Sequence, residues 1–353
     1  MRFIHCADLH LDSKIDSLPK EHAKVRRQEI IASFERLCTF AKDNSVTAVI
    51  IAGDAFDTRK VSTKTLSRFF HAISKTPCDF LYLAGNHDEA TIKFAQDIPN
   101  NLYFFQDDWT QFRYGNVNIV GANSVSYGIL SETLSLNEQD KNIVVMHGQI
   151  AGYKSDIDAE LISLPRLKNK HIDYLALGHI HSYSLEKLDN RGVFAYSGCL
   201  DGRGFDETGE KGFILLEETE KGFDSQFIPF SSRQFIEEEY VLNSEFDWWK
   251  QVDAIISTLL IKYNESSLIK LVLKGKHKAD YFKDLASLTE KLNQKFFYAK
   301  VYDKTTLQID VKDYEYDKSV KGEFVRLVFS SDLNEEQKNS IILCGLNAFK
   351  GEE

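Results

Sequence analysis

The sequence is poor in cysteine, in positive charge and in long apolar runs, and each shortage bears on the class of protein. Five cysteines occur, scattered and never as a Cys-x-x-Cys pair: Cys6, Cys38, Cys78, Cys199 and Cys344. That pattern argues against a disulfide framework and against a cysteine zinc site. No apolar run approaches the roughly 20 residues that cross a bilayer. Residues 1–8 reach a carboxylate before an apolar region develops, so we expect no signal peptide, a cytoplasmic location and no membrane contact.

The shortage of positive charge bears on whether the partner is a nucleic acid. The chain has 43 Lys and Arg against 53 Asp and Glu, a formal net charge of −10. A duplex-binding protein usually shows a basic surface. Residues 262–304, however, contain ten Lys against five Asp or Glu. The charge distribution therefore permits a nucleic-acid partner without requiring one.

Short apolar runs alternate with helical and polar segments over the first 230 residues, which predicts an α/β fold. Strands are expected at 2–7, 48–52, 80–84, 117–121, 142–146, 174–177 and 193–196, followed by a hairpin of 213–217 and 225–229. Helices are expected at 23–43 and 62–74. Several of the strands are continuously apolar, as expected for strands that are covered on both faces.

The character of the sequence changes near residues 231–239, so we expect two domains, 1–232 and 233–353. The second is predicted to be a smaller α/β module that holds the Lys-rich stretch. Its strands are expected at 268–274 and 297–302, and its helices at 246–263, at 279–295 and from about residue 334.

Residue types that bind metals gather at the ends of five predicted strands, where open α/β sheets place their ligand sites. The five segments are Asp8-Leu9-His10, Gly53-Asp54-Ala55-Phe56-Asp57, Gly85-Asn86-His87-Asp88-Glu89, His147-Gly148 and Gly178-His179-Ile180-His181. Each segment alone could be a simple turn, because Asn and Asp tolerate left-handed backbone geometry. Five of the ten histidines fall in these segments beside carboxylates, which favours one metal site over five unrelated loops.

The residue types also indicate the chemistry of this site. Asp8 and His10 lie two apart on an extended segment, as do His179 and His181, so each pair can face one side. Mixed carboxylate, imidazole and amide ligands suit Mn²⁺, Fe or Zn²⁺. Asp54 is the natural bridging carboxylate for two cations about 3.5–4 Å apart, which together activate water for an in-line displacement.

The order of these motifs resembles that of the calcineurin-like metallophosphoesterases and, within them, of the bacterial SbcD-type DNA-repair exonucleases. Finer matches lie at residues 52–57, 83–88, 177–181, 196–198 and 204–207. The resemblance covers residues 1–230 well and the remainder only in outline. It implies a two-sheet αββα metallophosphoesterase sandwich followed by a smaller α/β capping domain.

The resemblance further implies a role for each site residue. One metal ion would be held by Asp8, His10, Asp54 and His181. The other would be held by Asp54, Asn86, His147 and His179. His87 would contact the scissile phosphate, and Asp88 would orient His87. The implied cofactors are two divalent ions, with Mn²⁺ preferred and Fe or Zn²⁺ as alternatives.

Other features leave alternatives open. Asp57 stands where archaeal and eukaryotic members of this nuclease family carry a His, so any role of that His in strand handling does not transfer. Arg203 either grips phosphate or is a solvated turn residue. The lysines of 274–278 either follow a DNA backbone or form a solvated face. In SbcD-type proteins, C-terminal helices dock on an SbcC-type ATPase; the candidate here, 334–349, could equally pack on its own domain.

Three functions follow from these observations. The leading hypothesis, which rests on the resemblance, is a Mn²⁺-dependent 3′→5′ exonuclease and single-strand endonuclease in DNA repair, acting as a homodimer with an SbcC-type SMC-like ATPase. The second keeps the dinuclear chemistry but makes the chain a phosphodiesterase or phosphatase on a non-DNA substrate. The third is a non-catalytic scaffold, which the complete ligand set disfavours.

Overall fold

The chain divides into two compact units, Met1–Gln234 and Phe235–Glu353. The sequence placed this boundary after residue 232. A computed structural model describes residues 1–57, 61–84, 97–123, 127–151, 161–243, 246–278, 281–307 and 314–350.

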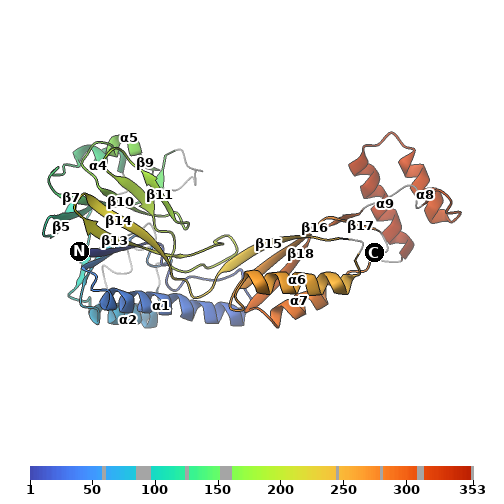
Figure 1. The fold of residues 1–353 in the computed structure, drawn as a ribbon, viewed down its shortest axis with the longest axis horizontal. Helices are drawn as coiled ribbons and strands as arrows, with labels where there is room; N and C mark the ends of the chain where they lie inside the picture. Colours follow the sequence, from blue (N-terminus) through green and yellow to red (C-terminus); the bar gives the residue numbers. More distant parts are fainter. Residues whose placement is uncertain are drawn as a thin grey trace. The chain divides into compact units, whose positions relative to one another are not determined.

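The first unit is a four-layer sandwich of two sheets between two helical layers (Figure 1). One sheet consists of β1 (Arg2–Cys6), β2 (Ala48–Ala52), β3 (Asp79–Leu83), β4 (Leu102–Phe104), β13 (Gly212–Thr219) and β14 (Gly222–Pro229). The other consists of β5 (Thr110–Tyr114), β6 (Val117–Gly121), β7 (Lys141–His147), β10 (Tyr174–Gly178), β11 (Ser184–Lys187) and β12 (Val193–Tyr196). The remaining elements are α1 (Lys20–Asp43), α2 (Thr63–Ser74), α4 (Tyr127–Thr133), α5 (Leu164–Leu167), β8 (Gln149–Ile150) and β9 (Leu161–Ile162).

The strand order brings the predicted site segments to one edge of each sheet. In the first sheet the order is β14-β13-β1-β2-β3-β4, with β1 to β4 parallel and β13 antiparallel to β1. In the second it is β11-β12-β10-β7-β6-β5, with β6, β7, β10 and β12 parallel. The carboxyl ends of β1 and β2 therefore meet at one edge, and those of β7 and β10 meet at one edge of the other sheet.

Three apolar layers hold this sandwich together. Between the sheets, residues of both, such as Phe3, Ile50 and Val145, form one fully buried cluster. The outer face of the β7–β10 sheet packs under α4 and α5, with Leu167 fully buried. On the other outer face, Phe34 of α1 stacks on Phe69 of α2 with ring centroids 4.7 Å apart. Because β2 has apolar layers on both sides, all five of its residues are buried.

The second unit contains a parallel sheet of order β15-β16-β18. The elements are β15 (Phe235–Val241), α6 (Trp248–Lys262), β16 (Leu268–Lys274), β17 (Lys276–His277), α7 (Leu285–Asn293), β18 (Tyr298–Asp303) and β19 (Thr306–Leu307). Asp247 caps the N-terminus of α6 by accepting a hydrogen bond from the Lys250 amide. Val252 of α6 and Leu288 of α7 are fully buried in one cluster with Leu271 of β16, so the two helices cover one face of the sheet.

The last described residues form a pair of helices with a small core of their own. The two helices are α8 (Val320–Phe329) and α9 (Glu335–Lys350). Val325 and Ile342 are fully buried between them. The pair also carries exposed apolar side chains, including Leu327 and Phe349. The predicted closing helix therefore packs on α8, an element that the sequence did not predict.

The two-sheet α/β fold of the first unit, followed by a smaller α/β unit, confirms the predicted fold class. Among the described residues, no helix is both long enough and apolar enough to cross a membrane.

Candidate metal centre

Main-chain hydrogen bonds bring the segment after β1 beside the segment after β2. The amides of Asp8, His10 and Leu11 donate to the carbonyls of Gly53, Asp54 and Ala55 over 2.8–3.0 Å. In the other sheet, the Gly148 amide donates to the Gly178 carbonyl over 3.2 Å. The His179 amide donates to both carboxylate oxygens of Asp8, each at 3.0 Å. This last contact joins the two sheets at the site.

The backbone is strained at the residues that carry the chemistry. Asp8, His10, Asp54 and His179 all have positive φ, at 50°, 44°, 51° and 100°. Non-glycine residues rarely adopt this region, and each such residue costs about 1–3 kcal/mol unless its surroundings compensate. Four such residues at one site indicate that the backbone accepts unfavourable φ values in order to direct these side chains toward one another.

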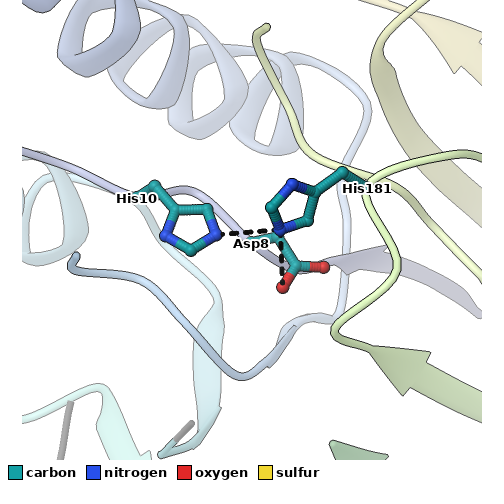
Figure 2. Close-up of side chains that lie close together, drawn as sticks. All are labelled: Asp8, His10 and His181. Atoms are coloured by element: carbon teal, nitrogen blue, oxygen red, sulfur yellow. Dashed lines mark hydrogen bonds and ion pairs between the residues drawn. The ribbon is translucent and has the colours of Figure 1, made fainter. Parts of the chain in front are cut away.

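Asp8, His10 and His181 form the first of two groups of potential ligand atoms (Figure 2). The Nε2 atoms of His10 and His181 face each other at 3.1 Å, and Asp8 Oδ1 lies 4.0 Å from His181 Nε2. A carboxylate lies behind each ring: Asp57 Oδ1 is 3.2 Å from His10 Nδ1, and Glu207 Oε1 is 2.8 Å from His181 Nδ1. Because the two Nε2 atoms are within hydrogen-bond distance of each other, either a shared proton or a bound cation can lie between them.

Asp8, Asp54 and His147 form the second group. His147 Nε2 lies 3.3 Å from Asp54 Oδ2, while its Nδ1 lies 2.8 Å from the Ala52 carbonyl oxygen. That carbonyl can only accept a hydrogen bond, so Nδ1 carries the proton and Nε2 is available as a ligand. The ring of His179 is 5.6 Å from that of His147 between centroids. Asp8 belongs to both groups, and the predicted bridging role of Asp54 stays a prediction.

Two glycines allow His147 to reach this position. A Cβ added to Gly53 would lie 2.1 Å from His147 Nδ1. A Cβ added to Gly178 would lie 1.9 Å from the Ala52 carbonyl oxygen and 2.7 Å from His147 Nδ1. Gly53 also has a φ of 93°, which disfavours any other residue. The glycines of these two strand-end motifs, Gly53 and Gly178, are therefore explained by the close approach of one imidazole.

Arg203 links the two carboxylates that lie behind the histidines of the first group. Its Nε and Nη2 donate to Glu207 Oε1 over 3.0 and 2.7 Å, and its Nη1 donates to Asp57 Oδ1 over 3.2 Å. The solvated-turn interpretation of Arg203 is wrong, because both carboxylates hold the guanidinium. The phosphate contact considered from the sequence stays untested.

The charges of the site shift the pKa values of its histidines in opposite directions. Burial opposes protonation of His147, but the nearby carboxylates of Asp54 and Asp8 outweigh it and raise its pKa to about 10. For His181, burial is likewise outweighed by Glu207 and Asp8, and the pKa is raised. Burial, together with the neighbouring His147, lowers the pKa of His179. The carboxylates thus favour positive charge within the two ligand groups.

The site includes residues whose roles the sequence did not reveal. Glu207 was part of a recognised motif, at 204–207, but no function was assigned to it. Lys211 is buried and donates from Nζ to the His181 carbonyl over 2.8 Å. His5, within β1, is fully buried with Nδ1 2.9 Å from the Tyr174 hydroxyl. Asn86, His87 and Asp88 lie outside the described residues, and their predicted roles stay predictions.

The donor set fits divalent cations. Carboxylate and imidazole ligands converge without any thiolate ligand in the two groups, and two of the three histidines in them, His147 and His181, have an acceptor at Nδ1. Such partners fix the tautomer and raise the basicity of metal-binding imidazoles. These residues suit Mn²⁺, Fe or Zn²⁺ better than Ca²⁺ or Mg²⁺, which prefer oxygen ligands.

Fold and donor set together define a metallophosphoesterase, and comparison with known proteins agrees. Residues 1–183 match the calcineurin-like phosphoesterase family, and the chain belongs to that family. It is therefore a metal-dependent phosphoesterase, as the motifs predicted, and the family implies two divalent metal ions.

Three relatives illustrate the range of proteins that this chain resembles. It is 25% identical over 244 residues to YhaO, an uncharacterized metallophosphoesterase of Bacillus subtilis, covering 64% of this chain and 60% of that protein. It is 25% identical over 280 residues to the DNA double-strand break repair protein Mre11 of Methanosarcina acetivorans, covering 75% and 44%. It is 36% identical over 102 residues to the SbcD component of the nuclease SbcCD of Escherichia coli, covering 28% and 24%. The chain thus spans less than two thirds of each of these proteins.

Proposed function

We propose that this chain is a Mn²⁺-dependent DNA nuclease of the SbcD type that hydrolyses phosphodiesters at a dinuclear site. The observation that carries the proposal is the pair of ligand groups that share Asp8. Two bound cations would supply an activated water and neutralise charge that develops on the phosphoryl oxygens. The proposed activity is that of a 3′→5′ exonuclease and single-strand endonuclease in DNA repair, in the cytoplasm.

The chain's own residues would prepare and orient this site. Asp57 Oδ1 lies 3.2 Å from His10 Nδ1 as an ion-pair contact, and Glu207 accepts a hydrogen bond from His181 Nδ1, which directs Nε2 of that ring inward. The Ala52 carbonyl does the same for His147. The proposed metal ligands are Asp8, His10, Asp54, Asn86, His147, His179 and His181. In addition, His87 is proposed to protonate the leaving oxygen, with Asp88 orienting its ring.

The choice of DNA as substrate is supported by the relatives whose names state DNA repair or nuclease function. Mre11 of M. acetivorans and the SbcD protein of E. coli are such relatives. Because this chain spans less than two thirds of either, substrate and partners are part of the proposal. The chain's excess of ten acidic over basic residues would then make DNA binding depend on local basic surfaces such as 262–304.

We also propose that the second unit is a DNA-contact domain and that the protein acts as a homodimer with an SbcC-type SMC-like ATPase. The paired helices α8 and α9 are the candidate docking element. They have their own core and yet expose Leu327, Ile341 and Phe349. Exposed apolar groups on such a pair suit a coiled-coil partner.

A phosphodiesterase or phosphatase acting on another substrate is the alternative. The net charge of −10 and the similarity to YhaO, a metallophosphoesterase not named as a nuclease, favour it. The two proposed functions share the metal centre and differ only in the substrate that binds to it. The substrate must therefore be decided by assay.

The test is degradation of end-labelled duplex and single-stranded DNA by the purified protein with Mn²⁺. Asp54→Ala should abolish cleavage, whereas Asp224→Ala, at an exposed position on β14, should leave it unchanged. Cleavage by wild type but not by Asp54→Ala would support the nuclease, and the labelled products would give its polarity. If the protein leaves DNA intact but hydrolyses bis-p-nitrophenyl phosphate, the nuclease proposal is wrong and the alternative holds.

A further inference from the structure

We propose that Arg203 is a positioning residue that controls the metal affinity of one position of the centre and not of the other. By joining Asp57 and Glu207, it would fix the rings of His10 and His181. The proposal rests on the dinuclear site of the proposed function. It makes no assumption about the substrate.

The contacts run from one imidazole to the other through three charged side chains. His10 Nδ1 lies 3.2 Å from Asp57 Oδ1 as an ion-pair contact without hydrogen-bond geometry, and Asp57 Oδ1 accepts from Arg203 Nη1 over 3.2 Å. Arg203 then donates twice to Glu207 Oε1, which lies 2.8 Å from His181 Nδ1. Asp57, Arg203 and Glu207 are named here the Arg203 bridge.

The bridge places one cation between two carboxylates at one edge of the site. Glu207 Oε1 accepts from Arg203 Nε and Nη2, and Asp57 Oδ1 accepts from Nη1. A charged Glu207 is a strong acceptor for the Nδ1 proton of His181. The forked guanidinium serves both carboxylates at once, which a lysine ammonium cannot do in the same geometry.

The segment that carries the bridge is itself held firmly by α1. Arg26 is fully buried and donates through Nη2 to the Asp201 carboxylate and, over 2.7 Å, to the Gly202 carbonyl. Ser33 donates to the other Asp201 oxygen over 2.7 Å. Arg203 is the next residue, so the main chain that carries its side chain is held in place by these contacts. A rigid support of this kind is what precise placement of metal ligands requires.

The second ligand group is oriented by different means. His147 uses a main-chain acceptor, the Ala52 carbonyl, and its position depends on the absence of side chains at Gly53 and Gly178. A main-chain acceptor does not change when Arg203 is substituted. The structure therefore predicts that the two metal positions respond differently to the same mutation.

Calorimetric titration of the metal-free protein with Mn²⁺ alone tests this. Wild type should bind two ions. In Arg203→Met, one binding event should weaken by about 10–100-fold, the usual effect of removing such supporting contacts, and the other should be unchanged. The matched control is Arg191→Met, because Arg191 also forks onto a carboxylate, Asp173, but at the opposite end of β10.

Two single-site backgrounds identify the event that weakens. With His147→Ala, the remaining site contains His10 and His181, and adding Arg203→Met should weaken binding by the same 10–100-fold. With His181→Ala, the remaining site contains His147, and adding Arg203→Met should have no effect. Equal weakening in both backgrounds, or none in the first, would overturn the proposal.

Arg203→Lys covers the case in which Arg203→Met does not fold, which urea unfolding in EDTA would reveal. It keeps the charge and breaks the fork, so it should weaken the same event, and wild-type affinity in this variant would also overturn the proposal. Because Mn²⁺ is the only ligand, this outcome is separate from that of the DNA assay. Wild type that binds two ions but leaves DNA intact refutes the nuclease alone, whereas cleavage with unaltered Mn²⁺ affinity in Arg203→Met refutes the bridge alone.

Discussion

Gly53→Ala tests whether the metal centre requires the close approach of the His147 ring to the main chain at residue 53. The added methyl would lie 2.1 Å from Nδ1 and 2.5 Å from Cγ of His147, so the ring has to move. Gly209→Ala is the matched control, because Gly209 has a similar φ, 83° against 93°, and nothing lies within 4 Å of its added Cβ. Any difference between the two variants therefore measures the imidazole contact.

The magnitude follows from the contacts that are lost. Both variants force alanine into a left-handed conformation, which costs about 1–2 kcal/mol of unfolding free energy. Gly53→Ala adds about 1–3 kcal/mol for overpacking and about 1 kcal/mol for the hydrogen bond between His147 and the Ala52 carbonyl. We expect Gly53→Ala to be less stable than Gly209→Ala by about 2–4 kcal/mol and to lose one of two Mn²⁺ ions.

Urea unfolding in EDTA gives the stabilities, and titration with Mn²⁺ gives the stoichiometry. Adding His147→Ala to Gly53→Ala removes the overlapping ring and should recover most of the 2–4 kcal/mol without recovering the metal. Equal stability of Gly53→Ala and Gly209→Ala, with two Mn²⁺ bound in each, would show that the imidazole is not confined as described.

Three further predictions concern the support of the site. Arg26→Met should destabilise the metal-free protein by about 3–5 kcal/mol in urea, because it leaves the buried Asp201 carboxylate without a cation; a change below 1 kcal/mol would contradict this. The His147 proton stabilises the metal-free fold fully below pH 6.5, and this stabilisation is lost as the pH rises toward about 10. Mn²⁺ binding at pH 8 should therefore release about one proton, seen as a buffer-dependent heat that His147→Ala reduces. Deleting residues 314–353 should leave Mn²⁺ stoichiometry at two, since α8 and α9 have a separate core.

Buried strands were predictable because both of their faces are apolar. The predicted strands 48–52, 117–121 and 193–196 coincide with β2, β6 and β12. The two edge strands of the second sheet, β5 and β11, were missed for the opposite reason. They are only partly buried, so polar residues interrupt the apolar pattern by which a strand is recognised.

The sequence predicted which motifs meet at the site, but it did not predict the contacts between the side chains that support the metal ligands. Parallel strands end at one edge of a sheet, so the position of Asp8 beside Asp54 follows from sequence order. The contact between Arg203 and Asp57 joins residues 146 positions apart and depends on how the 201–207 segment crosses that edge. No local pattern encodes such a crossing, although the recognised motif at 204–207 marked the segment.

The two ligand groups also draw on both sheets of the sandwich. Asp8, His10 and Asp54 follow β1 and β2, whereas His147 is the last residue of β7 and His181 follows β10. A bound ion would therefore act as a removable cross-link between the sheets, and an ion in the first group would close a chain loop of about 170 residues as a disulfide would. During synthesis the first group cannot be completed before His181 has emerged, and His181 has no carboxylate beside its Nδ1 until Glu207 follows. Completion of the centre is thus expected late in folding, and a chelator should loosen the packing between the sheets as well as stop the chemistry.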